Sequence, residues 1–205
     1  MEAQLMLNDI LATFTQFMHS VESNVQLFTT WVGLLFGIHV LNMCLGRRLC
    51  VLGIHPRSLF GIPGIVFTVF LHVDFGHVFM NSILLVILGN LLAMGGLIKL
   101  MTIAVYSTIL GGGLVWLLGR PMIHVGASGL VMGLCGALCI QAYEQQTIYA
   151  WFLAGLMFYF FEHIAANLVP GEAGTSWEGH LFGFIAGGIA EHFQWTLDPF
   201  MKGIV

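Results

Sequence analysis

The sequence has few charged residues. Asp, Glu, Lys and Arg together make up 8% of its 205 residues, and 58% are hydrophobic, whereas an ordinary soluble domain is about a quarter charged. A chain with this composition and a mean hydropathy of +0.92 lacks the polar surface that a water-exposed fold requires. Several apolar runs approach the roughly 20 residues that cross a bilayer core. The sequence therefore predicts an all-α, multi-pass integral membrane protein, with the lipid bilayer as its surroundings.

Several other signals are also absent. The net charge of −4 is small and scattered, whereas nucleic-acid binding requires a basic patch or stripe. No GxxxxGK[ST] phosphate loop occurs, and the four cysteines form no CxxC pair. His72 and His77 are five residues apart, which differs from the i, i+4 spacing of a zinc-binding HExxH helix. We therefore expect no nucleic-acid partner, no metal and no cofactor.

Six apolar stretches have the length of a membrane span. They are residues 25–45, 78–98, 100–118, 125–143, 148–169 and 179–195. The connection over residues 46–76 contains apolar pieces too short to cross, and we expect it to lie partly in the membrane interface. The predicted membrane domain is thus residues 25–195, followed by a short C-terminal tail at 196–205.

The first 24 residues form a separate N-terminal segment in this prediction. Apolar residues recur at three- and four-residue spacing over residues 5–21, which predicts a short amphipathic helix. Such a helix would lie on the membrane or against the bundle. The first ten residues contain no Lys or Arg, so they lack the basic region of a signal peptide.

Six crossings determine which polar residues can meet. The connections before the second, fourth and sixth spans must all lie on the membrane side opposite the N-terminus, here called the far side. His77 and Asn81 begin the second span, Ser128 begins the fourth and His180 begins the sixth. Polar residues inside a membrane usually face the bundle interior or a wet cavity. The four side chains are therefore predicted to converge at one depth.

Small residues would let the fourth and sixth helices approach closely. Small-xxx-small spacing has this effect in membrane helices, and both helices contain it. Each glycine motif alone could be only a packing motif, but the histidines at matching depth favour a packed face that brings His180 towards Ser128. The glycines assigned to close packing are Gly126, Gly129, Gly133, Gly183 and Gly187.

Ser128 and His180 together offer a nucleophile and its base. A serine hydroxyl attacks only when a base removes its proton, and histidine titrates near neutral pH. An oxyanion needs preorganised donors. The backbone N–H of Ser128 at a helix start can supply one, and His77 and Asn81, four residues apart on one helix face, can supply others. No Asp is placed to orient His180, which indicates a Ser–His dyad.

Three motifs together resemble those of the rhomboid intramembrane serine proteases. The matching stretches are FLHVDFGHVFMN, HVGASGLVMG and GHLFGFIAGG, and their order and the six-span layout agree over roughly residues 25–195. The resemblance implies a six-helix rhomboid-type bundle with Ser128 as nucleophile, His180 as general base, and His77 and Asn81 beside the oxyanion. It also implies single-pass transmembrane proteins as substrates.

Two positions depart from the family pattern. Many members have a Trp-Arg pair in the first loop where this sequence has Ile62-Pro63-Gly64-Ile65, and members often have Tyr where it has Met132. A thioether can still contact an imidazole face. We expect lower or more selective activity rather than none.

The sequence predicts two opposite orientations. The positive-inside rule places the far side in the cytoplasm. The resemblance implies cytoplasmic termini and an outward-facing site in the cell (inner) membrane, and we favour it because two of the arginines can lie in an interfacial loop. The basic residues counted are Arg47, Arg48, Arg57 and Arg120 on the far side, and Lys99 and Lys202 on the other.

Other functions were weighed against proteolysis. A non-catalytic rhomboid-like protein, binding transmembrane helices in quality control or trafficking, is the main alternative, but such relatives generally lack the serine or the histidine. A transporter is disfavoured because no internal repeat is present. Glu162 and His163 in the predicted fifth span either line a substrate gate or hydrogen-bond to a neighbouring helix, and we favour the second use. The sequence leaves the oligomeric state open.

Overall fold

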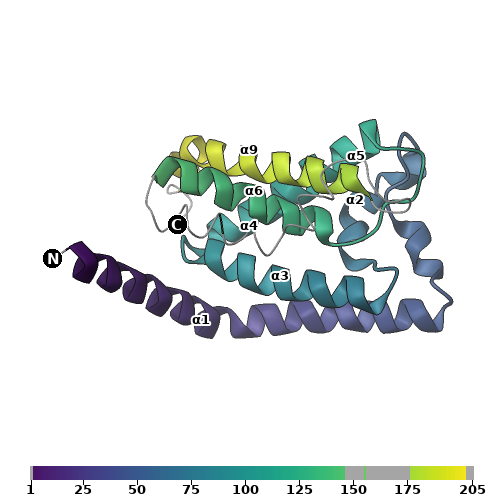
Figure 1. Cartoon of the computed structure of the whole chain (residues 1–205). Coiled ribbons are helices and arrows are strands. Elements are labelled where there is room, and N and C mark those ends of the chain that lie inside the picture. Colours follow the sequence, from purple (N-terminus) through teal and green to yellow (C-terminus); the bar gives the residue numbers. More distant parts are fainter. Residues whose placement is uncertain (1, 146–154, 156–175, 202–205) are drawn as a thin grey trace.

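A computed structural model describes residues 2–145, 155 and 176–201 of the chain. Within these residues every named element is a helix, and the backbone pairing between Ile54 and His124 is an isolated bridge. The predicted fifth span at 148–169, with Glu162 and His163, lies outside the described residues. The helices form one bundle in which most run lengthwise across the view of Figure 1.

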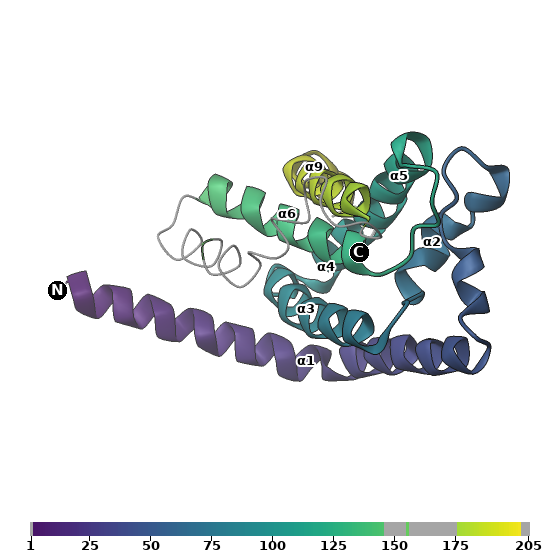
Figure 2. The same cartoon turned by 45° about the vertical axis from the view of Figure 1, so that its right-hand side comes forward.

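The longest element is α1, Glu2–Cys44, with 43 residues. It joins the predicted N-terminal helix and the first span into one helix, since residues 2–32 contain no Gly or Pro that would end it. At 1.5 Å per residue its length is about 64 Å, more than the ~45 Å of a whole bilayer. Its N-terminal part accordingly extends beyond the other helices in Figures 1 and 2.

The second and third spans are separated at a different place from the one predicted. Helix α3 is Phe75–Ala93, and α4, Leu97–Tyr106, continues through a π-helical segment, Ser107–Gly111, into α5, Gly112–Leu118. The chain turns at Gly96, whose φ of 105° favours glycine. Lys99, the predicted boundary, lies inside α4, where its ammonium pairs with Glu191 (2.5 Å).

The remaining long helices are α6, Ser128–Gln145, and α9, Trp177–Met201. The first loop contains four short helices: η1 (Arg48–Leu52), η2 (Leu59–Gly61), α2 (Gly64–Phe67) and η3 (Thr68–Phe70). In Figure 1 the starts of α3, α6 and α9 lie at the same end of the bundle as α2. The three predicted motifs therefore begin at one end of the bundle.

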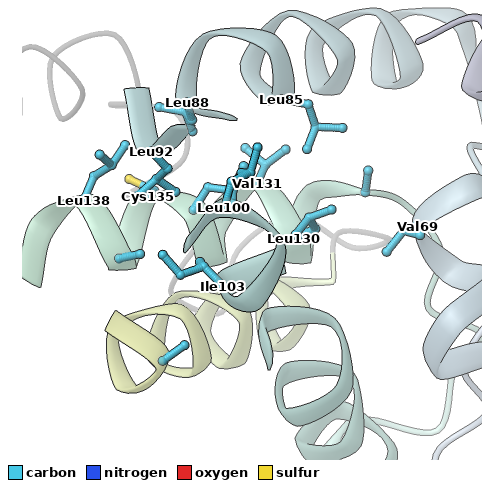
Figure 3. Packing of buried hydrophobic residues seen from close by; sticks show 14 of the residues in the cluster. Val69, Leu85, Leu88, Leu92, Leu100, Ile103, Leu130, Val131, Cys135 and Leu138 are labelled. Atoms are coloured by element: carbon cyan, nitrogen blue, oxygen red, sulfur yellow. The ribbon is translucent and has the colours of Figure 1, made fainter. Parts of the chain in front are cut away.

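The core lies between α3, α4 and α6. Figure 3 shows apolar side chains from these three helices facing one another, and all are buried. Lipid tails are as apolar as leucine, so burial from water does not drive helix association inside a bilayer and close packing does. The labelled members from these helices are Leu85, Leu88, Leu92, Leu100, Ile103, Leu130, Val131, Cys135 and Leu138.

Helices α6 and α9 form the most extensive helix pair in the described part of the chain. A methyl group on Gly183 would overlap the carbonyl oxygen of Gly129, and one on Gly187 would overlap that of Gly133. The four glycines therefore face one another in two layers, one turn apart, and the backbones touch.

Three helical stretches among the described residues are long and apolar enough to cross a membrane: Ile10–Cys44, Phe75–Ala93 and Leu97–Leu118. Much of their surface is apolar and exposed in the isolated chain, as expected for a surface that faces lipid. The protein is an integral membrane protein.

Candidate active site

Ser128 is the first residue of α6, and the turn before it is built on Gly126. The φ of Gly126 is +123°, a conformation that side chains rarely adopt, and its N–H donates to the carbonyl of Thr68 (3.0 Å). A Cβ at this position would lie 2.6 Å from Cε1 of His77 and 3.5 Å from Oγ of Ser128. The imidazole and the serine hydroxyl thus both border Gly126.

The role of Gly126 therefore differs from the helix packing that we predicted. It lies in the loop before α6, and its missing side chain gives room to the ring of His77 on α3 rather than to the backbone of a second helix. Gly129, Gly133, Gly183 and Gly187, by contrast, lie in the contact between α6 and α9.

His180 lies in the first turn of α9. A Cβ at Gly129 would lie 3.2 Å from the carbonyl oxygen of Gly179. Ser128 directly precedes Gly129, and His180 directly follows Gly179. The two predicted dyad residues therefore come from helix starts that are in van der Waals contact, although they are 52 positions apart in the sequence.

Asp74 caps α3 and so positions His77. Its carboxylate accepts a hydrogen bond from the backbone N–H of His77 (2.8 Å), which satisfies one of the unpaired donors of a helix start. The ring of His77 is half-buried and lies edge-on to that of His72, with ring centroids 5.0 Å apart. Asp74 thus serves as the N-cap of α3.

Sequence reasoning assigned no role to His72, which is fully buried. Its Nε2 accepts from the backbone N–H of Ala127 (3.3 Å) and lies 3.1 Å from Nδ2 of Asn81. Because a backbone N–H can only donate, Nε2 is unprotonated and the Asn81 amide donates to it. The signal available in the sequence was the shared motif HVDFGHVFMN, in which His72 precedes both predicted donors.

The environment of His72 keeps the ring neutral. Burial, with a smaller contribution from the neighbouring His77, lowers the pKa of His72 to about 3. A neutral ring can accept from Ala127 and Asn81 at once. One amide hydrogen of Asn81 is thereby used, and the second can serve another acceptor.

A cavity of about 40 Å³ lies beside Ser128. A water molecule needs roughly 10–15 Å³ measured in this way, so the cavity can hold more than one. Ser107, on the π-helical segment, lines it with a side chain that is buried and has no hydrogen-bond partner among the described residues. Its other polar lining residues are Thr68, Thr108, His124, Ser128 and Ser176.

The first loop is anchored without the Trp-Arg pair that many rhomboids have. The guanidinium of Arg57 donates to the carbonyls of Gly119 (2.8 Å) and Leu117 (3.2 Å). The Trp116 indole donates to the carbonyl of Ser58 (2.8 Å). These bonds tie the loop to the end of α5. Met132, which replaces the frequent Tyr, is buried in α6.

Comparisons with known proteins agree with this architecture. A family model described as "Rhomboid domain" matches residues 61–195, a region that contains all four predicted site residues. An uncharacterized protein of Mycobacterium bovis and one of Mycobacterium tuberculosis are each 31% identical over 172 residues, which cover 80% of this chain and 72% of theirs. An uncharacterized protein of Mycobacterium leprae is 30% identical over 173 residues, or 80% and 68%. The chain belongs to the rhomboid family.

Proposed function

We propose that this protein is an intramembrane serine endopeptidase that cleaves the transmembrane segments of single-pass membrane proteins. The observation that carries the proposal is the contact between the first turns of α6 and α9 beside Gly126. This contact brings the segments of Ser128, His180 and His77 together at one end of the bundle. Membership of the rhomboid family, which consists largely of such proteases, supports the same function.

The first half of the reaction forms an acyl-enzyme. His180 removes the proton of the Ser128 hydroxyl as Oγ attacks the carbonyl carbon of the scissile peptide. The negative charge that develops on the carbonyl oxygen is stabilised by the N–H of Ser128 at the start of α6, by the His77 ring and by the second amide hydrogen of Asn81. When the C–N bond breaks, His180 returns the proton to the leaving amine.

The second half of the reaction requires water. His180 removes a proton from a water molecule, which attacks the acyl carbon. The collapse of this second intermediate releases the new carboxyl group, and the proton returns to Ser128. The polar-lined cavity beside Ser128 offers water a place within the protein, where the surrounding lipid offers none.

The site also restricts the substrate. Ser128 lies between Gly126 and Gly129, and the adjoining cavity is about 40 Å³, so we propose that residues with small side chains flank the cleaved bond. A transmembrane helix has all its peptide carbonyls hydrogen-bonded. The substrate must therefore unwind locally before Ser128 can reach one.

We further propose that the chain crosses the cell (inner) membrane six times. Three described stretches are apolar enough to span, α6 and α9 run alongside them in Figure 1, and residues 148–169 have the apolar length of a sixth. Six crossings keep both termini on one side and the starts of α3, α6 and α9 on the other.

Labelling with a fluorophosphonate tests the nucleophile. Such a probe phosphonylates only an activated serine, so we expect the wild type to be labelled and Ser128→Ala and His180→Ala not to be. Ser58→Ala is the matched control, since Ser58 also lies on the far side but contributes only its backbone carbonyl to the contact with Trp116. This control should be labelled like the wild type.

The proposal is wrong if the folded wild type is not labelled, or if Ser128→Ala is labelled equally well. Incubation with a panel of tagged single-pass proteins, again comparing wild type with Ser128→Ala, then identifies substrates. A cellular phenotype that Ser128→Ala leaves intact would instead support a non-catalytic role in binding transmembrane helices.

A further inference from the structure

An ion pair joins the loop before α6 to the first turn of α9. The Glu178 carboxylate accepts three hydrogen bonds from Arg120. The donors are Nε (2.5 Å), Nη2 (3.0 Å) and the backbone N–H (3.2 Å). The Glu178 side chain is 2% exposed and that of Arg120 is 45% exposed. Two parallel bonds of this kind fix direction as well as distance. Glu178 is two residues before His180, and Arg120 is eight before Ser128.

A chain of hydrogen bonds runs beside this ion pair. Oγ of Ser176 accepts from the N–H of Gly179 (3.3 Å) and so caps α9, and it lies 2.6 Å from Nδ1 of His124. Nε2 of His124 lies 3.1 Å from the carbonyl of Arg120. A carbonyl only accepts, so Nε2 carries the proton and Nδ1 accepts from the Ser176 hydroxyl. Burial lowers the pKa of His124, which agrees with this neutral form.

The glycine contact between α6 and α9 lacks interlocking side chains, which would resist sliding of one helix along the other. Side chains that interlock prevent two helices from sliding along each other, but Gly129, Gly133, Gly183 and Gly187 present only backbone. Contacts at the two helix starts therefore help to set how far His180 lies from Ser128 along the bundle axis. The ion pair and the hydrogen-bond chain lie at that level, within one turn of His180.

We infer that Arg120 and Glu178, assisted by His124 and Ser176, are positioning residues that hold His180 at the correct height beside Ser128. The inference rests on the proposed proteolytic function. None of the four needs to touch the substrate; they act through the two helix starts that they connect. Misplacement of a reacting group by about 1 Å can reduce a rate by about a hundredfold, so a small shift of α9 would be visible in the kinetics.

The structure contains a matched control for this inference. Glu191 also lies on α9, is buried and pairs with a cation, Lys99 of α4, at 2.5 Å. It is 11 residues beyond His180, which is about 16 Å along the helix. Glu178→Gln and Glu191→Gln therefore remove the same kind of contact from the same helix, once near the site and once far from it.

We expect Glu178→Gln to lower kcat for a transmembrane substrate by about 10- to 100-fold with little change in KM. Glu191→Gln should leave kcat within about threefold of the wild type at a comparable loss of thermal stability. The double variant Arg120→Gln/Glu178→Gln should recover part of the activity, because two amides can hydrogen-bond and no unpaired charge remains. If the glutamine variants do not fold, Glu178→Asp and Arg120→Lys replace them in the same kinetic measurements.

A measurement that needs no catalysis accompanies the kinetics. In a Ser128→Ala background with isotopically labelled histidine, the NMR signal of the His180 ring should shift on Glu178→Gln and not on Glu191→Gln. Equal effects of the two variants on kcat and on the His180 signal would overturn the inference, as would an effect of Glu178→Gln on KM alone. A wild type that cleaves nothing while its His180 signal still responds to Glu178→Gln would reject the proteolytic function and leave the positioning role standing.

Discussion

The buried imidazole of His72 connects three parts of the candidate site. Its Nε2 accepts from Ala127, which directly precedes Ser128, and from Asn81 of α3. Its backbone carbonyl accepts from the amide of Asn42 near the end of α1 (3.3 Å). A protonated ring could accept neither of the first two bonds. A single proton on His72 would therefore disturb the turn that holds the nucleophile.

We expect the free energy of unfolding to decrease as the pH falls below about 6.5. The pKa of His72 falls from 6.5 to about 3 on folding, so between these values the unfolded chain binds a proton that the folded protein does not, and acid favours unfolding. At a pH of about 5 the loss from this group is about 2 kcal/mol. Thermal unfolding in detergent at pH about 7.5 and about 5 measures it.

The variant His72→Asn, neutral at every pH, should show a smaller change in Tm between the two pH values than the wild type. His19→Asn changes a histidine that is exposed on α1 and should behave like the wild type. The assignment to His72 fails if His72→Asn retains the full pH dependence.

At the scale of secondary-structure elements, the site depends on how closely α6 and α9 approach. The four glycines let the two backbones touch, and the same approach places the helix starts of Ser128 and His180 side by side. Packing and chemistry thus require the same short stretches. The GASG and GHLFG motifs cannot be assigned to only one of these purposes.

Gly183→Ala should destabilise the protein by about 1–3 kcal/mol and reduce fluorophosphonate labelling at least about tenfold. The added methyl group would overlap the backbone of Gly129 and force the start of α9 away from Ser128. Gly37→Ala on α1 is the control, since no atom lies within 4 Å of its added methyl group. Alanine also favours the helix there by about 0.5–1 kcal/mol. Thermal unfolding and the labelling rate measure both effects, and a stable, fully labelled Gly183→Ala would contradict the packing argument.

At the scale of the whole molecule, some features could be predicted from the sequence and others could not. Apolar length is a local property, so the membrane character and most helices follow from it. The sequence prediction placed the turn between the second and third spans at Lys99, whereas the structure has it at Gly96. A charge inside an apolar run resembles the end of a span unless its partner is known. That partner, Glu191, is 92 residues away. Glu178 and Arg120, 58 residues apart, escaped notice for the same reason, since only tertiary packing pairs them.

Pairing of charges also bears on the orientation in the membrane. Of the four arginines on the far side, Arg120 is paired with Glu178, whereas Arg57 donates to neutral backbone carbonyls and keeps its charge. On the other side Lys99 is paired with Glu191. A paired side chain contributes less to the attraction of lipid phosphates that underlies the positive-inside rule. The basic residues that remain are Arg47, Arg48 and Arg57 against Lys202, which are fewer than the full count, and we follow the orientation that the rhomboid family implies.

We therefore expect both termini in the cytoplasm and the starts of α3, α6 and α9 at the outer surface. A green fluorescent protein fused to the C-terminus should fluoresce, and an alkaline phosphatase fused there should be inactive, because each reporter works on one side of the membrane. Cys44, exposed at the far end of α1, should react with an impermeant maleimide in sealed cells. Because Cys50 in the same loop is half-exposed, Cys44→Ala should abolish that reaction in a Cys50→Ala background. An active phosphatase fusion, with Cys44 labelled only after permeabilisation, would show the opposite orientation, in which the site faces the cytoplasm as the positive-inside rule predicts.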